Sequence, residues 1–162
     1  MITQAEITVL SRTLIAAMLG FVIGWERMAV GVPIRWRIIT LTTMTSAAVT
    51  AVGVEMYATE TSRIVAGILT GVGFLGAGVI MRSSTGEVRG QATAAALWAM
   101  SCIGIIVGTG HTILGVILTL SIYLILAWGE WPILTQLNQR RKKQKEKDAQ
   151  SQQIIQKDEP DE

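Results

Sequence analysis

The stretch that decides the fold runs without a charge from Ile64 to Met81 and reads IVAGILTGVGFLGAGVIM. At about 1.5 Å per residue, a helix of this length matches the thickness of a bilayer's hydrocarbon core. Within it, the segment from Gly71 to Gly76 has the G-x-G-x-x-G spelling of a dinucleotide-binding turn. That turn requires a preceding strand and a later acidic residue at a set distance, and the sequence predicts neither. We therefore predict a glycine-rich transmembrane helix.

Helical periodicity places the small residues of this stretch on two faces. One stripe consists of Arg63, Gly67, Gly71, Phe74 and Gly78, and a broadly different side consists of Ala66, Gly73, Gly76 and Ile80. Because helices in lipid associate by close packing, such faces let neighbouring backbones approach. We expect this to be the central helix of a bundle, with packing as the role of its glycines. The alternative is a helix that opens around Gly73 and Gly76 and exposes carbonyls to an ion.

The rest of the chain alternates apolar runs with short polar connections and ends in a charged segment. This pattern predicts an all-α membrane protein with five transmembrane helices, at about 7–25, 38–55, 64–81, 92–107 and 113–129. Residues 1–137 form the predicted transmembrane domain. Every Lys and every Asp lies in the segment 138–162, which is therefore predicted to be a disordered cytoplasmic tail. Alternatively, its basic part binds anionic lipid.

The distribution of arginines predicts the orientation. The basic side comprises Arg27, Arg35, Arg37, Arg82, Arg89 and the cluster 140–147, whereas the other side holds Glu6, Glu55, Glu60, Arg63 and His111. Because basic residues concentrate in the cytoplasm, we expect the N-terminus outside and the C-terminus in the cytoplasm of a multi-pass protein of the plasma membrane.

Polar residues within the predicted spans are expected to have structural roles. Arg12, near one end of the first span, is expected to extend its side chain to the interface. The hydroxyl groups of the second span are expected to bond helix carbonyls and to form a packing face rather than a permeation path.

Several kinds of chemistry are excluded by composition. The chain has one His and no Asp before the tail, so a Ser-His-Asp arrangement is excluded, and no ATP-binding Gly-x-x-x-x-Gly-Lys-Ser/Thr loop is present. Cys102 is the only cysteine and cannot form an internal disulfide. We predict no enzymatic activity, no cofactor and no nucleic-acid partner. Bound Mg²⁺ is possible, but the predicted spans contain no internal carboxylate, which Mg²⁺ usually prefers.

Several motifs occur in a fixed order along the chain. They are Gly24-Trp25-Glu26-Arg27, then Gly31, Pro33 and Arg37, then Arg63-Ile64 and the run from Gly71 to Ile80, and finally Val88-Arg89-Gly90, Thr93-Ala94-Ala95 and Leu97-Trp98. Together they resemble the transmembrane domain of the MgtC/SapB family of bacterial inner-membrane proteins. Departures from the family pattern are Met28, where the family often has a second acid, and Arg35-Trp36 before Arg37. The cytoplasmic ligand-sensing domain of many members is expected to be absent.

The resemblance and the charges together define candidate functional residues. They are Glu26, Arg27, Arg37, Arg63, Gly71, Gly73, Gly76, Gly78, Arg89, Gly90 and Trp98. We expect Glu26, Arg27, Arg37, Glu87 and Arg89 to converge at the cytoplasmic edge. There they would either fix helix ends through ion pairs or bind a partner protein or an anionic ligand.

Two functions remain open. The resemblance implies adaptation to low magnesium or related ionic stress, which we expect to proceed by binding another membrane complex, with a homo-oligomer also possible. The alternative is a carrier or channel for magnesium or another cation.

Overall fold

The structure is a computed structural model that describes residues 2–29, 36–82 and 88–128. Its helices are α1 (Gln4–Ala29), α2 (Trp36–Met56), the 3-10 turn η1 (Ala58–Glu60), α3 (Thr61–Val79), α4 (Gln91–Gly108) and α5 (Thr112–Trp128). The prediction of an all-α membrane protein with five helices is confirmed, apart from a short hairpin that joins α3 to α4. In this hairpin β1 (Met81–Arg82) pairs with β2 (Val88–Arg89) in antiparallel register.

Within the described residues, four helical segments are long and apolar enough to cross a membrane: Gln4–Ala29, Trp36–Met56, Ala58–Val79 and Gln91–Gly108. The apolar part of α5, Thr112–Ala127, is shorter. Met1–Tyr123 belongs to one compact unit, whereas the end of α5 from Leu124 belongs to a second. The chain is therefore a membrane protein whose first unit contains all four long spans.

Local sequence explains where α1 begins. The backbone N–H of Thr3 donates to a carboxylate oxygen of Glu6 at 2.6 Å, and the N–H of Glu6 donates to the Thr3 hydroxyl at 3.3 Å. This reciprocal capping box satisfies two N–H groups that have no partner within the helix. The helix therefore begins at Gln4 and includes Glu6 in its first turn.

Four threonines of α2, Thr40, Thr42, Thr43 and Thr45, bond carbonyls of their own helix, as expected, whereas the buried hydroxyl of Thr50 has no hydrogen-bond partner among the described residues. The hydroxyl of Thr43 donates to the Ile39 carbonyl at 2.8 Å, and that of Thr45 donates to the Leu41 carbonyl at 2.7 Å. Such bonds satisfy a hydroxyl without a partner from another helix. The described contacts therefore agree with a packing role for these threonines.

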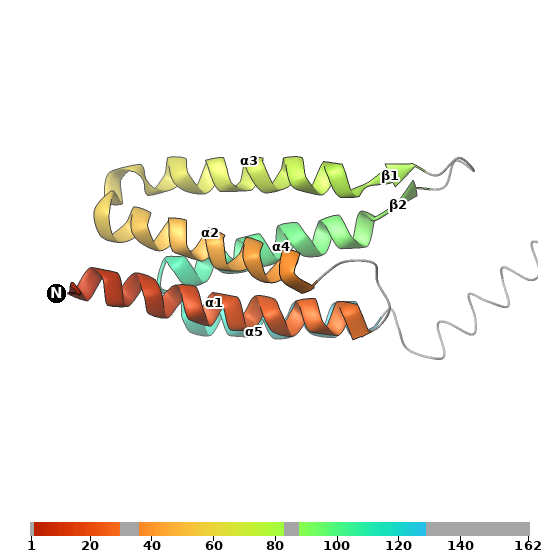
Figure 1. The fold of residues 1–162 in the computed structure, drawn as a ribbon, viewed down its shortest axis with the longest axis horizontal. Coiled ribbons are helices and arrows are strands. Elements are labelled where there is room, and N and C mark those ends of the chain that lie inside the picture. Colours follow the sequence, from red (N-terminus) through yellow and green to blue (C-terminus); the bar gives the residue numbers. More distant parts are fainter. Residues whose placement is uncertain (1, 30–35, 83–87, 129–162) are drawn as a thin grey trace, which may run out of the picture. The chain divides into compact units, whose positions relative to one another are not determined.

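The helices run alternately up and down, and α2 and α4 form the centre of the packing (Figure 1). The prediction that the glycine-rich helix is central was wrong: among the residues of α3, only Val72 and Gly76 are buried. By contrast, α4 buries Ala94, Ala96, Leu97, Met100, Ser101, Ile103, Gly104, Ile105, Val107 and Gly108. Helical periodicity assigns the small residues of α3 to faces. It could not show which helix would be surrounded.

Close approach of α2 to its neighbours depends on glycines of α1 and α4. A Cβ atom added to Gly20 would lie 2.9 Å from the Thr43 side chain, and one added to Gly108 would lie 2.6 Å from the Ala47 carbonyl. Between α2 and α4, the hydroxyls of Ser46 and Ser101 form a buried hydrogen bond of 2.8 Å. The core is therefore held by backbone contact and one buried polar pair.

Candidate functional site

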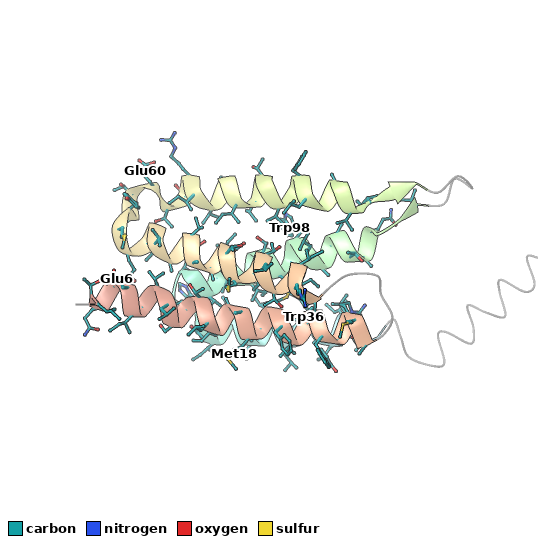
Figure 2. The ribbon with its side chains drawn as sticks, viewed as in Figure 1. Glu6, Met18, Trp36, Glu60 and Trp98 are labelled. Carbon is teal, nitrogen blue, oxygen red and sulfur yellow. The ribbon has the colours of Figure 1, made fainter. Side chains whose placement is uncertain are left out.

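The alternating helices bring the sequence motifs to two ends of the first unit (Figure 1). The motif end contains the end of α1, the start of α2, the β1–β2 hairpin and the start of α4. The opposite end contains η1 and the turn between α4 and α5. Figure 2 shows Trp36 at the motif end and Glu60 at the opposite end.

At the motif end, Glu26 and Arg27 form a two-point ion pair. The Arg27 guanidinium donates from Nε and Nη2 to the two carboxylate oxygens of Glu26, at 2.5 and 2.6 Å. Arg27 is only 6% exposed and lies on the same buried stripe of α1 as Gly20, Ile23 and Gly24. The pair is thus largely withdrawn from water, where charge-assisted hydrogen bonds are strongest.

Beside this pair lies a cluster of aromatic rings, which we call the aromatic platform: Phe21, Trp25 and Trp36. The Phe21 ring lies 5.7 Å from that of Trp25 and meets Trp36 edge-on at 5.3 Å, between centroids. Arg37 is exposed, and its Cζ lies 5.5 Å from the centroid of the Trp36 ring. The platform therefore holds a cation over an aromatic face.

The predicted convergence of charges is described only in part. Glu87 lies outside the described residues. For Arg89 the structure gives the backbone position in β2. Glu26 pairs with Arg27, whereas Arg37 stacks on its neighbour Trp36. Among the described side chains at the motif end, Glu26 and Arg27 therefore form one ion pair, and Arg37 is a separate cation stacked on Trp36.

Gly90 has a backbone role at this end. Its φ is +90°, a conformation that side chains disfavour, and an added Cβ would overlap the carbonyl of Val79. Gly90 is also the N-cap of α4. A glycine here lets the chain pass closely by the end of α3 as it enters α4.

At the opposite end, Arg12 links three helices. Its Nη1 lies 3.2 Å from a carboxylate oxygen of Glu55 on α2 and donates to the Gly108 carbonyl of α4 at 2.9 Å. Arg12 thus has protein partners, where the sequence suggested only an interfacial side chain. The sequence shows Arg12 as a lone arginine in the first span and Glu55 at the end of the second. Their spacing in sequence does not show that the two side chains meet.

Two further candidate residues are exposed. Arg63 pairs with Glu60 one turn away at 3.3 Å, with 83% of its side chain exposed. Trp98 is 48% exposed on α4. Neither residue lies in the packed core.

The candidate glycines of α3 differ in their surroundings. A Cβ added to Gly71, Gly73 or Gly78 would have no heavy atom within 4 Å, whereas one added to Gly76 would lie 3.7 Å from the Ala94 side chain. Gly67 is equally open. We call the side of α3 that carries Gly67, Gly71 and Gly78 its open face.

A groove of about 270 Å³ lies beside this open face, between α2 and α3. It is lined by Leu41, Thr42, Thr45, Ser46, Val49, Gly67, Ile68, Gly71, Val72 and Leu75. The lining is mostly apolar, with hydroxyl groups on the α2 side. Residue spacing within one helix does not predict this groove, because its walls come from both α2 and α3.

Metal ligands do not cluster within the described ranges. No group of three or more His, Cys, Asp or Glu side chains there could hold a metal ion. Among the described residues, the partner of the His111 ring is the Thr109 hydroxyl, which lies 3.1 Å from Nδ1.

Comparison with known proteins gives the relationships of this chain. The model of the MgtC family matches residues 13–132. An uncharacterized protein of Haemophilus influenzae is 35% identical, covering 72% of this chain and 53% of that protein. Protein SrpB of Synechococcus elongatus is 36% identical, and the match covers 72% of this chain and 71% of SrpB. Protein MgtC of Salmonella typhimurium is 41% identical, and the match covers 60% of this chain and 42% of that protein. The chain thus spans about half of the Haemophilus protein's length, and no solved structure matches it.

Proposed function

Since the chain belongs to the MgtC family, we propose that it is a non-enzymatic protein of the bacterial inner membrane that binds and regulates another membrane protein during ionic or magnesium stress. The N-terminus would lie outside and the C-terminus in the cytoplasm. The observation that carries this proposal is the open face of α3.

This face has the composition of a helix–helix contact but makes none within the chain's described part. Gly67 and Gly71 are about one helical turn apart, Gly78 lies about two turns further along the same side, and an added Cβ on any of them has no heavy atom within 4 Å. Phe74, between them in sequence, is 80% exposed. Lipid chains gain little from contact with glycine, whereas another helix can approach its backbone closely. These features support a partner helix on this face.

The adjacent groove extends the surface available to such a helix. Leu41 and Val49 of α2 and Leu75 of α3 supply apolar walls, and Thr42 and Thr45 supply hydroxyls. Both threonines already donate to carbonyls of α2, so a partner needs no polar group to satisfy those protons. An apolar transmembrane helix is therefore the occupant that this surface fits best.

The competing function, a magnesium carrier or channel, has less support. In the structure α3 is helical without a break from Thr61 to Val79, so its carbonyls at Gly73 and Gly76 are not presented by an opened segment. Magnesium also prefers carboxylate and other oxygen ligands in octahedral order. Magnesium flux through purified protein in liposomes, reduced by Glu26→Gln, would favour this alternative.

Photo-crosslinking tests the proposal directly. A photoreactive phenylalanine analogue at Phe74 should give an adduct with another membrane protein in native membranes. The same analogue at Ile117 of α5, which is 55% exposed, serves as the matched control. Gly71→Leu should abolish the adduct at position 74, whereas Gly71→Ala should retain it, because alanine preserves a small surface.

Each other outcome has a defined meaning. Equal labelling of lipid alone at both positions would remove the basis of the proposal. An adduct only with a second copy of the chain would replace the proposed partner with a homo-oligomer. Helical content measured by circular dichroism should be the same in both Gly71 variants, since a Cβ added there has no heavy atom within 4 Å.

A further inference from the structure

Arg37 differs from the other arginines whose side chains the structure describes. Arg12, Arg27 and Arg63 each pair with a carboxylate, on Glu55, Glu26 and Glu60 respectively. Among the described residues no carboxylate lies within ion-pair distance of Arg37, and its side chain is exposed. The nearest acid along the preceding helix, Glu26, is already bound at both oxygens by Arg27. Arg37 therefore retains its charge and donors for an external anion.

The aromatic platform fixes where this cation lies. Trp25 is 53% exposed and Phe21 is 41% exposed, while Trp36 is half-buried beneath Arg37. Tryptophan side chains favour the boundary between hydrocarbon and headgroups. The last turns of α1 and the start of α2 meet here, and we expect headgroup phosphates at this depth.

The platform is also held firmly against α1. A Cβ added to Gly24 would lie 2.7 Å from the carbonyl oxygen of Trp36, so the first residue of α2 lies directly on the backbone of α1. Stacking on the Trp36 ring further restricts the Arg37 guanidinium. A restricted guanidinium loses less side-chain entropy when it binds an anion.

We propose that Arg37 and the aromatic platform form a binding site for one anionic phospholipid. The guanidinium donates to the headgroup phosphate, for which its planar fork of N–H groups is suited. The first part of an acyl chain lies on the exposed faces of Phe21 and Trp25. This site is separate from the open face of α3, because it is formed by α1 and α2 at the motif end.

Native mass spectrometry of the full chain in detergent, with phosphatidylglycerol and phosphatidylcholine added together, tests this site. We expect the wild type to retain phosphatidylglycerol preferentially and Arg37→Gln to lower that preference by about fivefold, the effect of one basic group near an anionic membrane. Arg63→Gln is the matched control, since it removes an exposed charge at the opposite end. It should leave the preference unchanged.

Two further measurements separate the parts of the site. Trp36→Leu keeps the charge of Arg37 but removes its support, so it should lower the preference less than Arg37→Gln does. Millimolar inorganic phosphate should not displace the lipid if the acyl chain contributes to binding. An unchanged preference in Arg37→Gln, or an equal loss in Arg63→Gln, would overturn the proposal, and loss of lipid to phosphate alone would reassign the site to free phosphate.

Discussion

Replacing Gly104 by alanine inserts a methyl group where α4 and α2 lie closest. The added Cβ would overlap the Thr43 carbonyl oxygen, and it would lie 2.9 Å from the Ser46 Cβ and 3.2 Å from the Ala47 nitrogen. Carbon atoms attract each other best at about 3.5 to 4.0 Å, so the Ser46 contact alone requires the helices to separate by at least about 0.6 Å. Such a shift would also lengthen the adjacent 2.8 Å hydrogen bond between Ser46 and Ser101.

The expected loss of stability follows from these contacts. Overpacking of a well-packed interior costs about 1 to 3 kcal/mol. Backbone atoms cannot rotate away as a flexible side chain can, so we expect Gly104→Ala to lie in the upper half of that range. A cost of about 2 kcal/mol lowers the folded-to-unfolded ratio by roughly 30-fold.

Gly71→Ala provides the matched control. It makes the same chemical change in another apolar helix, but its Cβ would have no heavy atom within 4 Å. Alanine favours a helix over glycine by up to about 1 kcal/mol, so this variant should be as stable as the wild type or more stable. Unfolding by sodium dodecyl sulfate in mixed micelles, followed by circular dichroism, measures both variants. Equal stability of Gly104→Ala and Gly71→Ala would refute the close approach of α2 and α4.

Two other predictions concern the ends of the helices, and the same unfolding assay measures both. Arg12→Gln should destabilise the protein more than Glu55→Gln, because Arg12 also donates to the Gly108 carbonyl; the coupling energy from a double-mutant cycle should be about 1 kcal/mol or less for this partly exposed pair. Equal effects of the two single changes would argue against the bond to Gly108. Gly90→Ala should cost more than about 1 kcal/mol, since it combines a disfavoured φ of +90° with overlap on the Val79 carbonyl. An unfolding midpoint of Gly90→Ala equal to that of the wild type would contradict the close approach of Gly90 to the Val79 carbonyl.

Much of the local structure could be predicted from the sequence. The uncharged run from Ile64 to Met81 indicated a membrane helix, and the structure has a helix at Thr61–Val79. The helices predicted at about 92–107 and 113–129 correspond to α4 and α5 of the structure. Hydrogen bonds within a helix and the length of an apolar run are local properties, so neighbouring residues suffice to predict them.

The candidate site could be predicted less completely. Glu26 and Arg27 are adjacent in sequence, and they pair as neighbours can. Arg12 and Glu55 are far apart in sequence, and only the antiparallel packing of α1 and α2 brings them together. The contact between Phe21 of α1 and Trp36 of α2 also depends on the packing of these two helices.

The sequence alone determined that this chain forms apolar membrane helices and carries the motifs of its family, because these depend on residue type and spacing. Only the tertiary structure decided that Gly104 is packed while Gly71 is open, and that α4 rather than α3 lies at the centre. The physical reason is that lipid is as apolar as a protein interior, so hydrophobicity does not distinguish a lipid-facing side from a buried one. Which small-residue face is buried depends on the shapes of two helices together, and that information is absent from either helix by itself.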